Sequence, residues 1–399
     1  MKPIQYIIQF AIVFFGAWAA SAQTWNPTAA STANWHAIAS SADGTKLVAA
    51  VEQGGIYTSA NSGQSWNQAP FAPTAAWISA ASSADGTILA AAAFDSGVYL
   101  SFDSGVHWTL QNLPSNGWFS VAISADGHEL VAAAYWNSTY NGPGPIYTSP
   151  NYGASWVSNS LPLQNWVSVA ISADGTKLAA AARGTQGANL SYFGPIYTSA
   201  NGGLNWSSNM LPSQIWSAIA ASADGRTLAA VALNGPVYGS TNFGTTWFPS
   251  SVPGITTNWL AVASTADAGM WLASVYGGGI YSSTNHGNTW VSNAAPALNW
   301  TGLTLSADGN KMASVIYKGG IYSAYANPVA KLGLSRSGTN LNFSWTVPAT
   351  NFSLQQNSNL ASATWSTVTN TPVLNLTNLQ NQVSLPLPAV NAFYRLKTP

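Results

Sequence analysis

A single sequence pattern repeats along most of the chain, and each copy opens at a tryptophan. A short alternating segment follows, then a Ser-Ala-Asp-Gly turn or a close variant, a Leu/Val/Ala-rich segment, a Gly-rich stretch and an Ile-Tyr or Val-Tyr pair. The opening tryptophans lie 41 to 50 residues apart, at Trp35, Trp77, Trp118, Trp166, Trp216, Trp259 and Trp300. A repeat of roughly 40–45 residues holding four short strands is typical of a propeller blade. The repeat therefore predicts an all-β fold, a seven-bladed β-propeller over residues 23–327.

The first turn of each copy carries an Asp-Gly pair in six of the seven copies, from Asp43-Gly44 to Asp308-Gly309. Asp-Gly predicts a two-residue hairpin, because both central residues of a type I′ turn adopt positive φ. The sixth copy reads Asp267-Ala268-Gly269 instead, and we expect a longer loop there.

The second turn of each copy is more specific. The first copy reads Ser59-x-Asn61-x-Gly63-x-x-Trp66, and the equivalent tryptophans of the next five are Trp108, Trp156, Trp206, Trp247 and Trp290. Asn or Asp can bond its own backbone two residues on, and Gly supplies the unusual φ. The motif resembles the Asp-box, or BNR repeat, of sialidases, sortilin-type receptors, xyloglucan-active glycosidases and photosystem assembly factors. That resemblance implies a propeller in which the box is structural, so it transfers no activity.

The two ends of the repeat array predict how the ring closes. The seventh copy ends without the second turn motif, so it lacks an outer strand. Thr24–Asn26 resembles the end of the first copy, and we expect it to supply that missing strand by pairing with the last copy. Residues 1–22 have one charge, Lys2, an apolar run and an Ala20-Ser21-Ala22 cleavage pattern, which predicts a signal peptide. We therefore expect a secreted protein, extracellular, periplasmic or on the cell surface.

Beyond the repeats, residues 328–399 hold five short strand candidates, from Asn342–Val347 to Phe393–Leu396. This pattern predicts a small β-sandwich module. Surface attachment or glycan binding and a purely passive packing role both remain open for it.

Charge and composition exclude several classes of function. Lys and Arg total 11 and Asp and Glu total 11, so the clustered basic charge that nucleic acids or anionic membranes require is missing. There is no cysteine, which excludes disulfides, thiolate metal sites and a cysteine nucleophile. The four histidines do not pair at ligand spacing, so we predict neither a metal site nor a cofactor, and we expect a monomer.

The longest insertions lie between the second and third strands of the third and fourth copies. They fall on the face that also carries the crossovers between copies, opposite the two turn motifs. They mix aromatic rings with Asn, Gln, Ser and Thr, which suits recognition of a polysaccharide or a surface protein. The predicted ligand-binding residues are Tyr135, Trp136, Tyr140, Arg183, Tyr192 and Phe193. The opening tryptophans start on this face too, where they either pack between blades or ring the channel mouth.

The alternative is a glycoside hydrolase of the Asp-box type, xyloglucan-active or sialidase-like. Outside the turns only Glu52, Asp95 and Glu129 remain as acids, and Glu129 lies on the other face. Glycosidases need two carboxylates about 5–10 Å apart, whereas the register of Glu52 and Asp95 predicts opposite sheet faces. The sialidase resemblance implies three substrate-binding arginines, and the repeats hold only Arg183 and Arg226. We therefore favour a non-catalytic recognition protein or an assembly scaffold.

Overall fold

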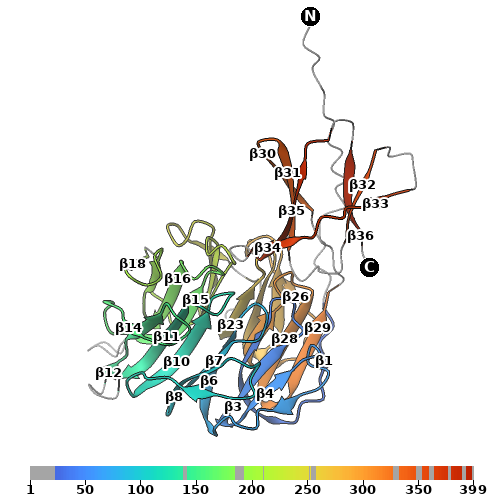
Figure 1. Cartoon of the computed structure of the whole chain (residues 1–399). Coiled ribbons are helices and arrows are strands. Elements are labelled where there is room, and N and C mark those ends of the chain that lie inside the picture. Colours follow the sequence, from blue (N-terminus) through green and yellow to red (C-terminus); the bar gives the residue numbers. More distant parts are fainter. Residues whose placement is uncertain are drawn as a thin grey trace, which may run out of the picture.

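The computed structural model describes residues 23–137, 142–184, 193–209, 211–250, 252, 258–326, 332–346, 353–358, 364–375, 379–388 and 392–397. Every regular element within these ranges is a β-strand, so the fold is all-β as expected (Figure 1). No helix of this described part is long and apolar enough to cross a membrane. The expected signal peptide lies outside the described residues.

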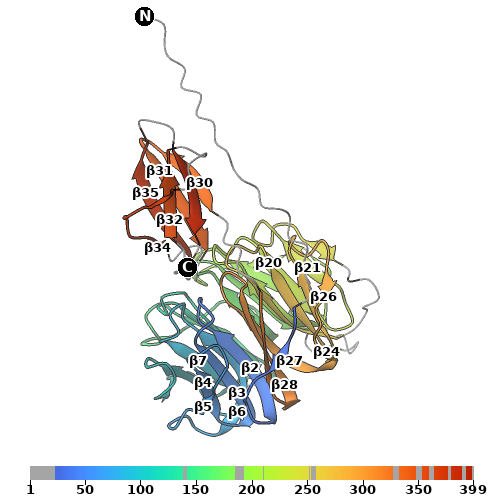
Figure 2. The ribbon, with the colours of Figure 1, turned by 90° about the vertical axis from the view of Figure 1, so that its right-hand side faces the viewer.

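The repeated sequence folds into four-stranded antiparallel units, and the first unit shows the pattern. It consists of β2 (Ala33–Ser40), β3 (Leu47–Gly54), β4 (Ile56–Ser59) and β5 (Asn67–Gln68), each paired with the next. The following units repeat this meander as β6 (Ala75–Ser82) to β9 (Thr109–Leu110), β10 (Asn116–Ile123) to β14 (Val157–Ser158), β15 (Asn165–Ile171) to β18 (Ser207–Ser208), β19 (Trp216–Ala221) to β22 (Phe248–Ser250) and β23 (Trp259–Ser264) to β26 (Val291–Ser292). Figure 2 shows these sheets following one another through the larger part of the molecule.

The remaining strands of these units complete the same order. The second strands are β7 (Leu89–Ala93), β11 (Leu130–Asn137), β16 (Leu178–Arg183), β20 (Leu228–Ala232) and β24 (Trp271–Gly278). The third strands are β8 (Gly97–Ser101), β13 (Ile146–Ser149), β17 (Ile196–Ser199), β21 (Val237–Ser240) and β25 (Ile280–Ser283), and the third unit adds the short β12 (Gly142–Pro143).

The last unit takes its outer strand from the other end of the chain. It contains β27 (Leu298–Leu305), β28 (Lys311–Gly319) and β29 (Ile321–Tyr325). Strand β1 (Asn26–Pro27) pairs antiparallel with β29, and Trp25 is buried against Trp300, with ring centroids 6.0 Å apart. The predicted pairing of the two ends is present, but its strand is Asn26–Pro27 rather than Thr24–Asn26.

The hydrophobic core lies between consecutive units, not inside any one of them. Trp77 of the second unit packs with Val48 of the first, and comparable clusters follow at each later junction. A further cluster joins Trp35 of the first unit to Val315 and Ile321 of the last. Alanines dominate β7, β16 and β20, and their small side chains let neighbouring sheets approach closely around the indoles there.

The opening tryptophans are all buried, with 0–1% of their surface exposed. Each ring meets a third-strand tyrosine edge to face, at centroid distances of 5.0 to 5.7 Å, as Trp35 does with Tyr57. Burying an indole removes about 150–250 Å² of mostly apolar surface from water. The prediction that these rings pack between blades is confirmed, and the alternative of an exposed indole ring is wrong.

The Ser-Ala-Asp-Gly turns are linked to one another by main-chain hydrogen bonds. The alanine N–H of each turn donates to the alanine carbonyl of the next, over 2.7–2.9 Å, and the series returns from Ala307 to Ala42. It runs through Ala42, Ala84, Ala125, Ala173, Ala223, Ala266 and Ala307. We call this end of the units the turn end, and the opposite end, with the connections between units, the crossover end.

The geometry of these turns differs from the predicted type I′ hairpin. Only the glycine has positive φ, as at Gly44 with φ 63°, while the Asp43 carboxylate accepts the Thr45 N–H at 2.9 Å. In the sixth copy Ala268 takes the glycine's place with φ 56°, and the Met270 N–H bonds Thr265 as Lys46 bonds Ser41 in the first copy. The expected longer loop is therefore wrong, because alanine adopts the glycine conformation.

The C-terminal residues form two further sheets around one core. One sheet has the order β30 (Gly333–Ser337), β31 (Asn340–Thr346), β35 (Gln380–Pro386), β34 (Val373–Asn375), and the other is β33 (Ser366–Thr367), β32 (Ser353–Asn357), β36 (Phe393–Lys397). Phe343 and Leu354 join the two sheets in one apolar cluster. Leu379, in the turn before β35, packs on the alanines of the turn end, where Figure 1 shows β34 and β35 beside the repeated sheets.

Candidate functional site

One sequence position of each repeat recurs at the crossover end. Each opening tryptophan pairs with a residue near the end of the second strand, for example Trp35 with Val51 and Trp166 with Ala182. The residue that follows this partner in the sequence occupies an equivalent place in every unit. We call these residues the crossover rim: Glu52, Phe94, Tyr135, Arg183, Leu233, Tyr276 and Tyr317. Four aromatic rings, one arginine, one carboxylate and one leucine thus occupy equivalent places at the crossover end of the second strands.

The rim side chains lie over the junctions with the following unit. Glu52 pairs with Ala76, Tyr276 with Asn299 and Tyr317 with Asn34 across these junctions. A Cβ added to Gly117 of the third unit would lie 2.8 Å from the Phe94 ring, so that ring covers the glycine. Because the rim stands on paired backbone, it is a more rigid platform than a loop would be.

Phe94 and Tyr276 are the rim aromatics most open to solvent. Phe94 is 38% exposed and Tyr276 is 41% exposed. Their backbone N–H groups donate to the carbonyls of Ala76 at 2.9 Å and Asn258 at 3.0 Å. These two rings can therefore contact a ligand while their backbones remain hydrogen-bonded to the neighbouring strand segment.

Tyr135 and Arg183 form a polar pair on this rim. The Tyr135 ring packs on Phe119 at a centroid distance of 5.4 Å, and Arg183 Nε donates to the Trp216 carbonyl at 3.1 Å. Burial lowers the pKa of the Arg183 guanidinium, and the nearby Tyr135 hydroxyl partly opposes that change. Arginine remains protonated at neutral pH all the same, so the pair presents a fixed positive charge beside a phenol.

The structure places some of the predicted ligand residues together and others apart. Tyr135 and Arg183 lie on the rim, while Tyr140 and Tyr192 fall outside the described residues. Trp136 pairs with Gly117 and Pro143 through its backbone, and a Cβ on Gly117 would lie 2.9 Å from the Trp136 Cβ and 2.8 Å from the Phe94 ring, so Trp136 lies beside the rim. Phe193 is 52% exposed, and its backbone lies against Gly184, next to Arg183.

Sequence reasoning missed four rim positions: Phe94, Leu233, Tyr276 and Tyr317. It followed insertions, which mark only the third and fourth copies, whereas these residues sit in copies of ordinary length. Aligning the copies on the opening tryptophan and reading the end of each second strand would have found them.

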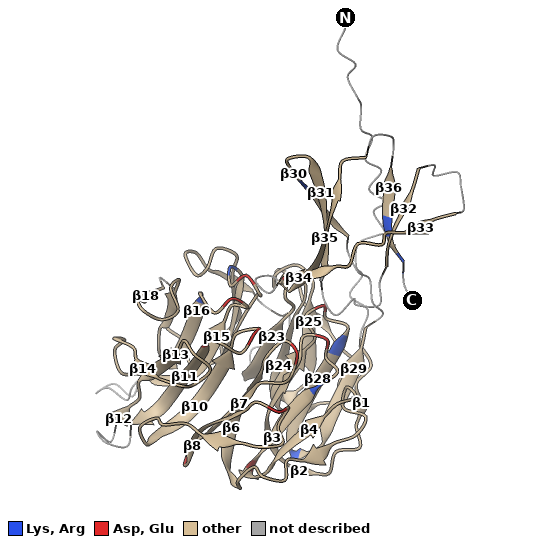
Figure 3. Cartoon of the chain, in the orientation of Figure 1, with Lys and Arg blue, Asp and Glu red and all other residues tan. Residues whose placement is uncertain are grey.

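The two candidate carboxylates have different surroundings at the crossover end. Asp95 Oδ1 accepts the Ala76 N–H at 3.1 Å, so a main-chain partner already holds it. Glu52 lies near His36, whose Nδ1 donates to the Ile78 carbonyl at 2.9 Å. Burial lowers the pKa of His36, which keeps the ring neutral at physiological pH, and Glu52 only partly counteracts this. No three His, Asp or Glu side chains gather anywhere in the described ranges, and Figure 3 shows how sparse charge is on the sheets.

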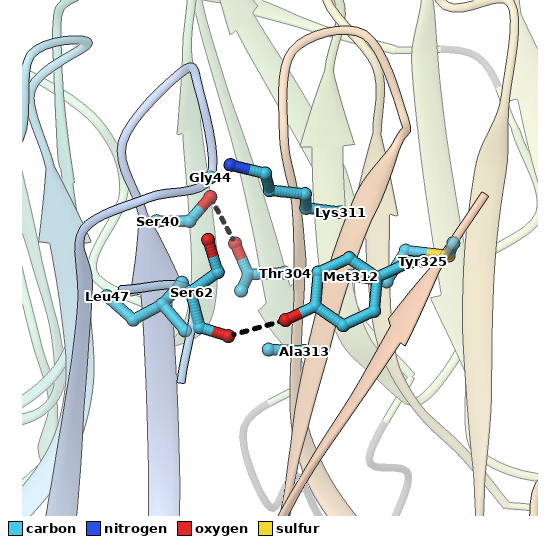
Figure 4. Close-up of a pocket in the computed structure, with 9 residues that line it drawn as sticks. All are labelled: Ser40, Gly44, Leu47, Ser62, Thr304, Lys311, Met312, Ala313 and Tyr325. Atoms are coloured by element: carbon cyan, nitrogen blue, oxygen red, sulfur yellow. Dashed lines mark hydrogen bonds between the residues drawn. The ribbon is translucent and has the colours of Figure 1, made fainter. Parts of the chain in front are cut away.

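A small cavity marks the junction of the first and last units (Figure 4). Its volume is about 10 Å³, room for roughly one water molecule. The Tyr325 hydroxyl donates to the Ser62 carbonyl at 3.1 Å, and Thr304 bonds Ser40 at 3.3 Å. These hydrogen bonds join residues more than 260 positions apart in the sequence. The cavity therefore belongs to the structural contact between the first and last units rather than to a ligand site.

The repeated sheets with cores between them define a β-propeller, and solved structures agree. YCF48 from Cyanidioschyzon merolae superposes with a TM-score of 0.57 at 15% identity, covering 76% of this chain and 98% of that one. YCF48 bound to a D1 peptide gives a TM-score of 0.57 at 15% identity, covering 78% of this chain and 97% of that one. No family profile and no curated protein matches the chain. At this identity the likeness establishes the fold alone.

Proposed function

We propose that this chain is an exported, non-catalytic recognition protein that binds an extended segment of a protein partner on the crossover rim. Its scaffold is a seven-bladed Asp-box propeller closed by β1, with a β-sandwich module behind it. Support for closure comes from the alanine hydrogen bonds that return to Ala42 and from the pairing of β1 with β29.

The observation that carries the proposal is the composition of the rim. Tyr, Phe and Arg are among the residues enriched where proteins bind proteins, since each offers a large contact area and Tyr and Arg add polar ends. Here they gather at the strand ends, with Phe94 and Tyr276 exposed and Arg183 held beside Tyr135. The opposite end of the units is occupied by Leu379 of the C-terminal module, which leaves the crossover end for a partner.

The fold comparison adds support of a more general kind. A propeller of similar fold has been solved with a D1 peptide bound. A propeller scaffold of this size therefore can hold a peptide, and the rim offers this chain its own means of doing so.

The test is binding of the full chain to an array of overlapping peptides, compared with a neutral and acidic glycan array. We expect peptide binding that Phe94→Ala and Tyr276→Ala each weaken by about tenfold or more, as loss of an interface anchor does. Tyr152→Ala is the matched control, because Tyr152 is also a half-open tyrosine, 43% exposed, but lies in the second turn motif at the turn end.

Two results would contradict the proposal that the crossover rim binds a protein partner. Peptide binding that survives both substitutions would place the interface elsewhere. Glycan binding that both substitutions remove, with no peptide bound, would replace the protein partner by a polysaccharide.

Export is tested separately from binding. Residues 1–22 fused to a phosphatase that is active only outside the cytoplasm should give activity, and a fusion that begins at residue 23 should not. Equal activity from both fusions would remove the secretion part of the proposal.

A further inference from the structure

A second surface, independent of the rim, lies on the outside of the molecule between the fourth and fifth units. It is a hollow of about 430 Å³, within the range of roughly 300–1,000 Å³ usual for small-molecule sites. Its walls include Asn201, Asn205, Ser207 and Ser208 from the fourth unit and Phe243 from the fifth. We call it the outer groove.

A local sequence change leaves free amide groups in this groove. In four other copies the motif Asn donates through Nδ2 to a hydroxyl four residues on, at 2.8 Å, as Asn61 does to Ser65. In the fourth copy the motif Asn is Asn201, and the residue four positions on is Asn205 instead of a Ser or Thr. The Asn205 backbone N–H still donates to Asn201 Oδ1 at 2.9 Å. Across the described ranges Asn201 Nδ2 donates no hydrogen bond, so both amides are available to a ligand.

A residue of the fifth unit gives the groove one apolar surface. In the fourth copy the residue before the motif glycine is Gly202, which has no side chain. The fifth copy has Phe243 at the same position, with φ 57°, and its ring packs on the core of the fourth and fifth units. An aromatic ring is thus fixed beside amides and hydroxyls.

The chemistry of the lining selects the ligand class. No lining residue carries a charge, so an ionic ligand would lose its hydration with no counter-charge to replace it. A purely apolar ligand would leave the amides unpaired, which is also unfavourable. Amides and hydroxyls donate and accept hydrogen bonds at once, as sugar hydroxyls require, and an aromatic face accommodates the C–H side of a sugar ring. We propose that the outer groove binds a neutral saccharide.

The experiment measures retention of the full chain on an array of neutral and acidic oligosaccharides. Ser208→Trp fills the groove from an exposed strand position, and Ser158→Trp is its matched control, since Ser158 has the same register and exposure in the third unit. We expect binding to neutral glycans that Ser208→Trp abolishes, Asn205→Ala weakens about fivefold, and Ser158→Trp leaves unchanged. Thermal unfolding of each variant verifies that it is folded.

Several outcomes would overturn the assignment. The folded wild-type chain could bind no neutral glycan, or acidic glycans alone. Ser208→Trp could leave binding intact, or Ser158→Trp could remove it equally. Because Phe94→Ala and Tyr276→Ala alter only the crossover rim, they should not change binding here, so failure of the groove is distinguishable from failure of the rim.

Discussion

At the scale of single residues, most acidic side chains of this protein serve as acceptors in turns. Asp85 accepts the Ser83 hydroxyl at 2.6 Å and the Thr87 N–H at 2.9 Å. Burial alone would raise its pKa, but these hydrogen bonds outweigh burial and hold the pKa below its ordinary value. The carboxylates of Asp43, Asp85 and Asp174, whose pKa values are all lowered in this way, thus stabilise the fold in their ionised form.

Asp103 offers the clearest test, because the second turn motif carries Asn in the other five copies. The His107 backbone N–H, the imidazole and the Ser101 hydroxyl lower its pKa to about 2. Since the folded pKa lies below 3.8, this group's stabilisation is complete above that pH and is lost as pH falls toward 2. Asp103→Asn should keep the fold and reduce the loss of melting temperature between pH 4 and pH 2.

The reciprocal substitution Asn61→Asp provides the control for that measurement. It introduces a titrating acceptor into the first copy, where Asn61 Oδ1 already accepts the Ser65 N–H at 2.9 Å. Acid sensitivity should therefore increase. Parallel pH profiles for all three proteins would contradict the assigned role of Asp103.

At the scale of elements, the two-residue strand β1 has a large expected effect on stability. β1 contributes few main-chain bonds, but it brings Trp25, only 4% exposed, into the cluster around Trp300 and Leu272. Replacing a buried Trp by Ala generally lowers stability by about 3–5 kcal/mol. Trp25→Ala should lower the free energy of unfolding by that amount in denaturant titration.

Trp136→Ala is the comparison, because Trp136 is half-buried at the crossover end and outside the core clusters. Its effect should be clearly smaller. Equal losses for the two variants would mean that β1 does not hold the last unit together.

The sequence predicted strands where periodicity and turn residues coincide, and it failed where the structure depends on distant contacts. The repeated units follow from their tryptophan spacing, and β31, β32, β33, β35 and β36 from alternation in the C-terminal residues. β30 and β34 were missed, since their partners β31 and β35 define them more than their own residues do. Tyr135 and Arg183 were predicted as ligand residues, but their proximity arises from the packing of neighbouring units.

At the scale of the whole molecule, the C-terminal module is joined to the repeated units by a contact that the local sequence pattern does not predict. Leu379 adopts φ 51°, unusual for a branched residue, and in doing so reaches the alanine cluster of Ala173, Ala223 and Ala266. Small side chains around the turn end leave space for one leucine, and the leucine shields their methyl groups from water. The backbone strain at Leu379 is therefore offset by apolar burial.

This contact predicts how firmly the two parts hold together. Leu379→Asp would bury an unpaired carboxylate against alanines, which is strongly unfavourable, so the module should separate from the repeated units. Limited proteolysis should then cut between residues 326 and 332 faster than in the wild-type chain. Leu374→Asp is the matched control, since Leu374 lies on the neighbouring strand β34 with 41% exposure and outside that cluster. Identical cleavage rates for Leu379→Asp and Leu374→Asp would mean that the leucine does not anchor the module, whereas separation with unchanged peptide binding would show that the rim works without it.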